Sequence, residues 1–142
     1  MDHRYLVVAN QTLDSDALWD WLESRVKEGP SALHILVPVT HPSGSWTDMS
    51  VWRQAEERLR EAKSHFAPLG AEVTGEVGDV SPFRAVDDVL MREQFDEMVV
   101  CTLPPGPSRW LKLDAVHRIR LTHPNIPLSH VIATRRLVGP RA

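Results

Sequence analysis

Residues 103–115, "LPPGPSRWLKLDA", concentrate side chains that could bind an anion. They follow the apolar run "EMVVCT", and a loop at the end of a buried strand is a common place for a phosphate site. Arg109 and Lys112 could hold an anion by charge-assisted hydrogen bonds. The main chain of this loop is poorly suited to anion binding, because its three prolines lack N–H donors and have a fixed φ. An anion site and a solvated basic loop both remain open.

Patterns for catalysis or metal binding are weaker. Ser108, Asp114 and His117 are the residue types of a hydrolase triad, but Ser108 lacks a Gly-x-Ser-x-Gly context. The seven histidines show no paired spacing typical of a metal site. Cys101 ends a buried run and is expected to be packing material. The sequence therefore predicts no catalytic residue and no metal.

Composition limits the function classes. A net charge of −3 argues against non-specific nucleic-acid binding, and the single cysteine excludes an intramolecular disulfide. No apolar run approaches the roughly 20 residues of a spanning helix. We expect a cytoplasmic protein without a membrane or nucleic-acid partner, with one domain at 1–134. Residues 135–142 form a basic tail carrying Arg135, Arg136 and Arg141.

Strands and helices that alternate along the chain must position the candidate site residues. Apolar runs of strand length occur at residues 5–9, 32–39, 71–77, 97–102 and 128–132. Segments of helical period separate them, and this alternation favours a parallel sheet with helices on both faces.

Local signals predict where these elements begin and end. Asp14 or Ser15 should cap the first helix, Ser81 the third and Asp114 the fourth. Pro38 lacks an N–H donor, so it should lie at a strand end or a bulge.

Nearly the whole chain resembles the universal stress protein family. The resemblance is carried by "YLVVANQTLDSDALWDWL", by "LGAEVTGEVGDVSPFRAVDDVLMREQFDEMVV" and by "HPNIPLSHVI". It implies a three-layer α/β/α sandwich with a five-stranded parallel sheet in the order 3-2-1-4-5. It also implies a homodimer through the last strand, Leu128–Ile132, and a nucleotide between the carboxyl ends of strands one and four.

This sequence departs from the pattern of the family's ATP-binding members, which is Gly-x-x-Gly, nine residues, then Gly-Ser or Gly-Thr. Cys101-Thr102 replaces the Gly-Ser pair at the strand end, Pro104 falls on a glycine position, and Gly106 matches one. Asp114-Ala115 replaces the final Gly-Ser pair.

Two further positions concern the adenine and ribose. Asn10 stands where binders have an aspartate, and Val39 falls on the residue that packs on adenine. For a ligand at the family position, the resemblance implies contacts from Ala9, Asn10, Gln11, Thr12, Val39, Thr102, Gly106, Ser108, Arg109, Lys112 and Ala115.

A carboxylate cap at Asp114 would take the helix's free amides and repel a phosphate. Two unit charges 4 Å apart repel by about 4 kcal/mol at an effective dielectric of 20. We therefore expect no ATP in the usual pose and assign no firm cofactor.

Three hypotheses follow. The first is a non-catalytic module that binds a small anion or another ligand in the crevice. The second is an adenine-nucleotide binder that uses Arg109 and Lys112 in place of the glycines. The third is an enzyme acting on a small substrate, with polar groups from Asn10, Thr12, Thr102 and Ser108.

Overall fold

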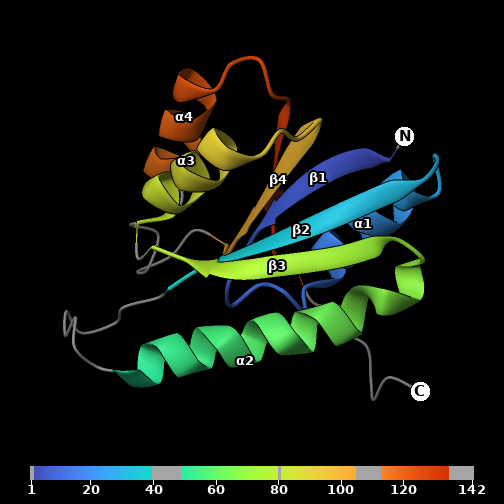
Figure 1. Ribbon diagram of the computed structural model, residues 1–142, viewed down its shortest axis with the longest axis horizontal. Coiled ribbons are helices and arrows are strands. Elements are labelled where there is room, and N and C mark those ends of the chain that lie inside the picture. Colours follow the sequence, from blue (N-terminus) through green and yellow to red (C-terminus); the bar gives the residue numbers. More distant parts are fainter. Residues whose placement is uncertain (1, 40–48, 80, 105–112, 135–142) are drawn as a thin grey trace.

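A five-stranded parallel sheet forms the centre of the molecule, with strands in the order β3-β2-β1-β4-β5 (Figure 1). The computed structural model describes residues 2–39, 49–79, 81–104 and 113–134. Its elements are β1 (His3–Val8), α1 (Asp16–Val26), β2 (Ser31–Pro38), α2 (Met49–Phe66), η1 (Ala67–Leu69), β3 (Glu72–Gly78), α3 (Pro82–Arg92), β4 (Glu97–Thr102), α4 (Leu113–Thr122) and β5 (Leu128–Ile132). The predicted fold class, element order and strand order are confirmed.

Two hydrophobic cores lie on opposite faces of the sheet. Val7 and Ile35 pack with Leu18 of α1 and Phe66 of α2 in one core. The next residues along the strands, such as Leu6 and Leu36, pack in the second core, which includes Val86 of α3 and Ile119 of α4. Central strands buried on both faces need continuous apolar runs, which explains the sequence pattern. The sheet is therefore the middle of three layers, and Figure 1 shows α2 and the α3–α4 pair on opposite sides of it.

The helix and strand ends follow local chemistry. Ser15 caps α1, where its Oγ accepts a hydrogen bond from the Ala17 amide at 3.2 Å. Ser81 caps α3 in the same way, with Pro82 as the first helical residue. Pro38 is the last residue of β2, and Gly70 ends η1 with a φ of 87°. The predictions for Ser15, Ser81 and Pro38 are confirmed.

Helix α2 packs closely on the edge strand β3 at Gly75. A Cβ atom there would lie 2.5 Å from Leu59 Cδ1 and 2.7 Å from the Ile35 carbonyl oxygen. Glycine is therefore required at this position by the distance between the helix and the sheet.

The prediction that Asp114 caps the fourth helix is wrong. Helix α4 begins at Leu113, so Asp114 is its second residue rather than the residue before it. Lys112, which precedes Leu113, lies outside the described residues.

Several other predictions also concern residues that the structure does not describe. Gly106, Ser108, Arg109 and Lys112 fall there, as does the basic tail at 135–142. Among the helices of the described part, none is long and apolar enough to cross a membrane.

Candidate functional site

The turn between β1 and α1 is bound to the end of β4. Thr12 in this turn is 3% exposed, and its Oγ1 donates a hydrogen bond to the Cys101 carbonyl at 2.9 Å. The Ser15 amide in turn donates to the Thr12 carbonyl at 2.9 Å. A buried hydrogen bond from the Thr12 hydroxyl thus joins the β1–α1 turn to β4, at the point where the strand order reverses.

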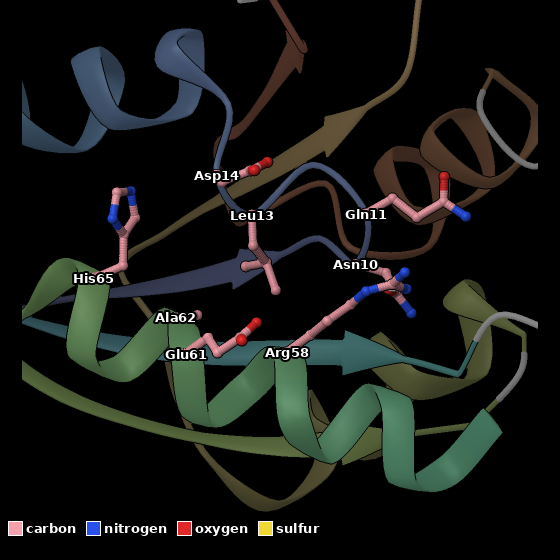
Figure 2. A pocket seen from close by; sticks show the side chains of 8 residues that line it. All are labelled: Asn10, Gln11, Leu13, Asp14, Arg58, Glu61, Ala62 and His65. Carbon is pink, nitrogen blue, oxygen red and sulfur yellow. The ribbon is translucent and has the colours of Figure 1, made fainter. Parts of the chain in front are cut away.

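Asn10 joins three elements at the same end of the sheet. Its Nδ2 donates to the Pro38 carbonyl at 2.5 Å, at the end of β2. Its Oδ1 accepts a hydrogen bond from Nη1 of Arg58 in α2. Figure 2 shows the Arg58 side chain extending along the cavity to meet Asn10. Both ends of the Asn10 amide therefore have partners inside the protein.

A cavity of about 540 Å³ lies between the β1–α1 turn and α2. Its lining residues are Asn10, Gln11, Leu13, Asp14, Arg58, Glu61, Ala62 and His65 (Figure 2). The turn contributes the Asp14 carboxylate, and α2 contributes the Glu61 carboxylate and the Arg58 guanidinium. We call this space the turn–α2 cavity. With neutral histidine, its lining carries one more negative charge than positive.

Thr102, at the end of β4, also has a partner within the protein. Its Oγ1 lies 2.7 Å from Nε2 of His130 in β5, and the residue is 4% exposed. Burial, followed by the nearby Arg120 guanidinium, lowers the pKa of His130. The Thr102 hydroxyl is therefore already paired with a side chain of the neighbouring strand.

Cys101 is 5% exposed, in line with its expected packing role. Burial raises the pKa of its thiol, although the Thr12 and Ser15 hydroxyls act in the opposite direction. A buried thiol with a raised pKa is a poor nucleophile.

The structure brings part of the predicted set of site residues together at the carboxyl ends of β1, β2 and β4. Ala9, Thr12, Val39 and Thr102 are each 4% exposed or less. Gln11 is exposed, whereas Ala115, in the first turn of α4, is half-buried. Of the predicted set, Asn10 and Gln11 line the turn–α2 cavity.

The sequence reasoning missed the contribution of α2. Arg58, Glu61 and His65 follow the i, i+3, i+7 spacing of one helix face, so they reach the cavity together. That spacing indicates a shared face, but nothing in it identifies Asn10 as the partner of Arg58. Within the described ranges, no group of three or more histidine, cysteine, aspartate or glutamate side chains could hold a metal ion.

No family model and no curated protein matches the chain. Solved structures do resemble it. A universal stress protein from Archaeoglobus fulgidus has 15% identity and a TM-score of 0.63, over 94% of this chain and 95% of that one. A universal stress protein family protein from Arabidopsis thaliana with AMP bound has 15% identity and a TM-score of 0.61, over 93% and 92% of the two chains. A universal stress protein in complex with cAMP has 12% identity and a TM-score of 0.55, over 94% and 98%. The fold is that of the universal stress proteins.

Proposed function

We propose that this chain, which has the universal stress protein fold, is a non-catalytic ligand-binding module. The proposed ligand site lies at the carboxyl ends of β1 and β4, where ligands of open α/β sheets generally bind. In this proposal, the crevice does not hold a triphosphate in the usual pose. It takes a small ligand without a polyphosphate, and the turn–α2 cavity forms one side of the binding site.

The hydrogen bonding of Asn10 is the observation that carries the proposal. Its amide is used on both sides, by the Arg58 guanidinium and by the Pro38 carbonyl. A ribose or adenine that competed for Asn10 would leave these partners unpaired, at a cost of roughly 1–3 kcal/mol for each buried group. The hydroxyls of Thr12 and Thr102 are also paired within the protein.

The charge of the cavity supports the same conclusion. A polyphosphate in or beside it would approach the Asp14 and Glu61 carboxylates, while the Arg58 guanidinium is already bonded to Asn10. Such repulsion amounts to about 4 kcal/mol for unit charges 4 Å apart at an effective dielectric of 20. A neutral ligand avoids this cost.

A second candidate function is adenine-nucleotide binding in which Arg109 and Lys112 replace the glycine loop. It is favoured by the two structural neighbours that contain AMP and cAMP. A monophosphate carries less charge than ATP, so it meets less repulsion from the acidic lining. In this alternative the basic side chains supply the donors that the loop prolines lack.

A homodimer through β5 belongs to the same proposal. In the described part of the sheet, β5 pairs with β4 on one side and lies at the sheet edge on the other. An edge strand offers unpaired backbone groups to a second copy. Light scattering of the full chain would measure its mass.

Thermal unfolding with added ligand tests the proposed function. A ligand at about 100 times its dissociation constant adds roughly 2.7 kcal/mol to the free energy of unfolding. We expect no rise in Tm with magnesium-ATP, because the paired Asn10 amide and the acidic lining of the cavity both disfavour the nucleotide. A rise with magnesium-ATP contradicts the first function.

Paired variants separate the two candidates. If a nucleotide raises Tm, and Arg109→Ala with Lys112→Ala abolishes the rise, the second function is supported. The matched control is Arg53→Ala with Lys63→Ala, which removes two exposed basic side chains of α2 that do not line the cavity. Loss of the rise in both pairs would indicate a general charge effect instead.

A further inference from the structure

We propose that a second cavity, at the amino-terminal end of the sheet, binds a small organic cation with a primary ammonium group. The cavity lies between the end of α1 and the first residues of β1, β2 and β4, at the opposite end of the sheet from the proposed ligand site. The inference therefore goes beyond the proposed function and does not depend on it. Its support is an unpartnered hydroxyl in the cavity and the charge around that hydroxyl.

This cavity, which we call the Tyr5 cavity, has a volume of about 220 Å³. Strand β1 contributes His3 and Tyr5, and the first residue of β4 contributes Glu97. The end of α1 and the turn after it contribute Arg25 and Glu28. Sites for drug-sized ligands usually have roughly 300–1,000 Å³, so this cavity suits a smaller molecule.

The hydroxyl of Tyr5 is open to this cavity and has no partner. Tyr5 is 3% exposed, and its ring lies 4.7 Å from that of His3 and 5.8 Å from that of Trp21, between centroids. Within the described ranges, the hydroxyl forms no hydrogen bond. The only fully enclosed side-chain nitrogen or oxygen without a partner in those ranges is Nε2 of His34, so the Tyr5 oxygen must face the cavity. Buried tyrosine hydroxyls usually have a hydrogen-bond partner, which a bound molecule would supply here.

The electrostatic potential at the Tyr5 hydroxyl is negative. Burial raises the pKa of this hydroxyl, Glu97, Glu28 and Asp96 raise it further, and Arg25 lowers it. The hydroxyl is therefore neutral at pH 7, and its oxygen can accept a hydrogen bond. The carboxylates that disfavour a tyrosinate equally favour a positive charge bound beside the hydroxyl.

Part of this negative charge is already paired within the protein. The Glu97 carboxylate lies 3.0 Å from Nη1 of Arg25 and 3.6 Å from Nε2 of His3. Glu28 is exposed and forms no ion pair in the described part of the chain. It follows the end of α1, where the helix dipole also favours a cation. A ligand ammonium can therefore donate to the Tyr5 hydroxyl and to Glu28 while the Arg25–Glu97 pair stays intact.

The same groups disfavour the other classes of small ligand. An anion would approach Glu28 and Glu97, and the Arg25 guanidinium that could attract it is already paired with Glu97. The described residues include no group of three or more histidine, cysteine, aspartate or glutamate side chains that could hold a metal ion. The cation that fits is therefore an organic one with N–H donors.

An NMR titration of the isotope-labelled full chain with butylammonium chloride tests the proposal, at an ionic strength held constant with sodium chloride. We expect saturating shifts at the amides of Gly29, Ser31 and Glu97, with a Kd in the millimolar range because the probe has few atoms. Tetramethylammonium chloride is the matched probe, since it has the same charge but no N–H donor. It should give no saturating shift.

Two variants identify the groups that bind the probe. Tyr5→Phe keeps the buried ring and removes only the hydroxyl, so it should raise the Kd for butylammonium about tenfold. Its urea midpoint should not fall, because the hydroxyl has no partner within the described protein. Glu28→Gln should also raise the Kd, whereas Glu56→Gln, an exposed carboxylate of α2 outside the cavity, should not. The Glu28 variant keeps the test valid even if the Tyr5 variant misfolds.

Four results would overturn the proposal. One is the absence of saturating shifts with butylammonium, and another is an equal response to tetramethylammonium. The third is an unchanged Kd in both Tyr5→Phe and Glu28→Gln. The fourth is saturating shifts at Gln11 and Glu61 alone, which would assign the cation to the turn–α2 cavity instead.

Discussion

Arg58, in the middle of α2, donates a hydrogen bond to Oδ1 of Asn10, which follows β1. The two residues are 48 positions apart in the sequence, and the bond links the longest helix to the end of a central strand. Asn10 also binds the Pro38 carbonyl, so the bond fixes the ends of β1 and β2 relative to α2. The wall of the turn–α2 cavity at Asn10 and Arg58 is therefore shaped by contacts within the protein.

Arg58→Ala should lower the free energy of unfolding by about 1 kcal/mol, because a half-buried amide oxygen loses a charged donor. Urea unfolding measures the change. Arg60→Ala is the matched control on the same helix, since Arg60 is exposed and pairs with Glu57. Its effect should stay below about 0.5 kcal/mol. Equal losses in the two variants would contradict a specific role for Arg58.

Thr12→Val should cost about 1–2 kcal/mol in unfolding free energy. The substitution keeps the side-chain volume but removes the buried hydroxyl that donates to the Cys101 carbonyl. Thr122→Val, at the exposed end of α4, makes the same chemical change and should have almost no effect. A Thr12 variant as stable as the wild type would show that the bond does not hold the turn to β4.

The stability of the protein should decrease in acid through His130. Burial and Arg120 lower the pKa of His130 in the folded state, so the unfolded state binds this proton more readily. The contribution is complete above the unfolded pKa of about 6.5 and is lost as pH falls through the lower folded pKa. Since the side chain is partly exposed, the effect should be a few tenths of a kcal/mol.

Two measurements check the His130 prediction. The NMR titration midpoint of His130 should lie below about 6.5. Urea unfolding between about pH 7.5 and 5 should depend less on pH in His130→Gln than in the wild type, because the variant lacks the titrating group. An identical pH dependence in both proteins would contradict this assignment.

Much of the fold was predictable because its causes are local in the sequence. Ser15 and Ser81 are good N-caps wherever they precede a helical pattern, and the structure uses both. Pro38 ends a strand because it cannot donate to a ladder. The cap at Asp114 was wrong because Leu113 already has helical geometry, and helix ends are uncertain by one or two residues.

The candidate site was less predictable because its contacts are distant in the sequence. Arg58 has the appearance of an ordinary charged residue on an amphipathic helix, and only the packing of α2 brings it to Asn10. The same applies to Thr102 and His130, which come together through pairing of β4 with β5. Sequence position indicated which end of the sheet to search but not which polar groups satisfy one another.

The most direct test of the central claim is an NMR titration of the isotope-labelled chain with magnesium-ATP. It follows the amides of Gly106, Ala115 and Val116, where the phosphates of a nucleotide in the usual pose would bind. The account predicts no saturating shift at these amides at millimolar ATP. Saturating shifts at all three, with a matching rise in Tm, would contradict it.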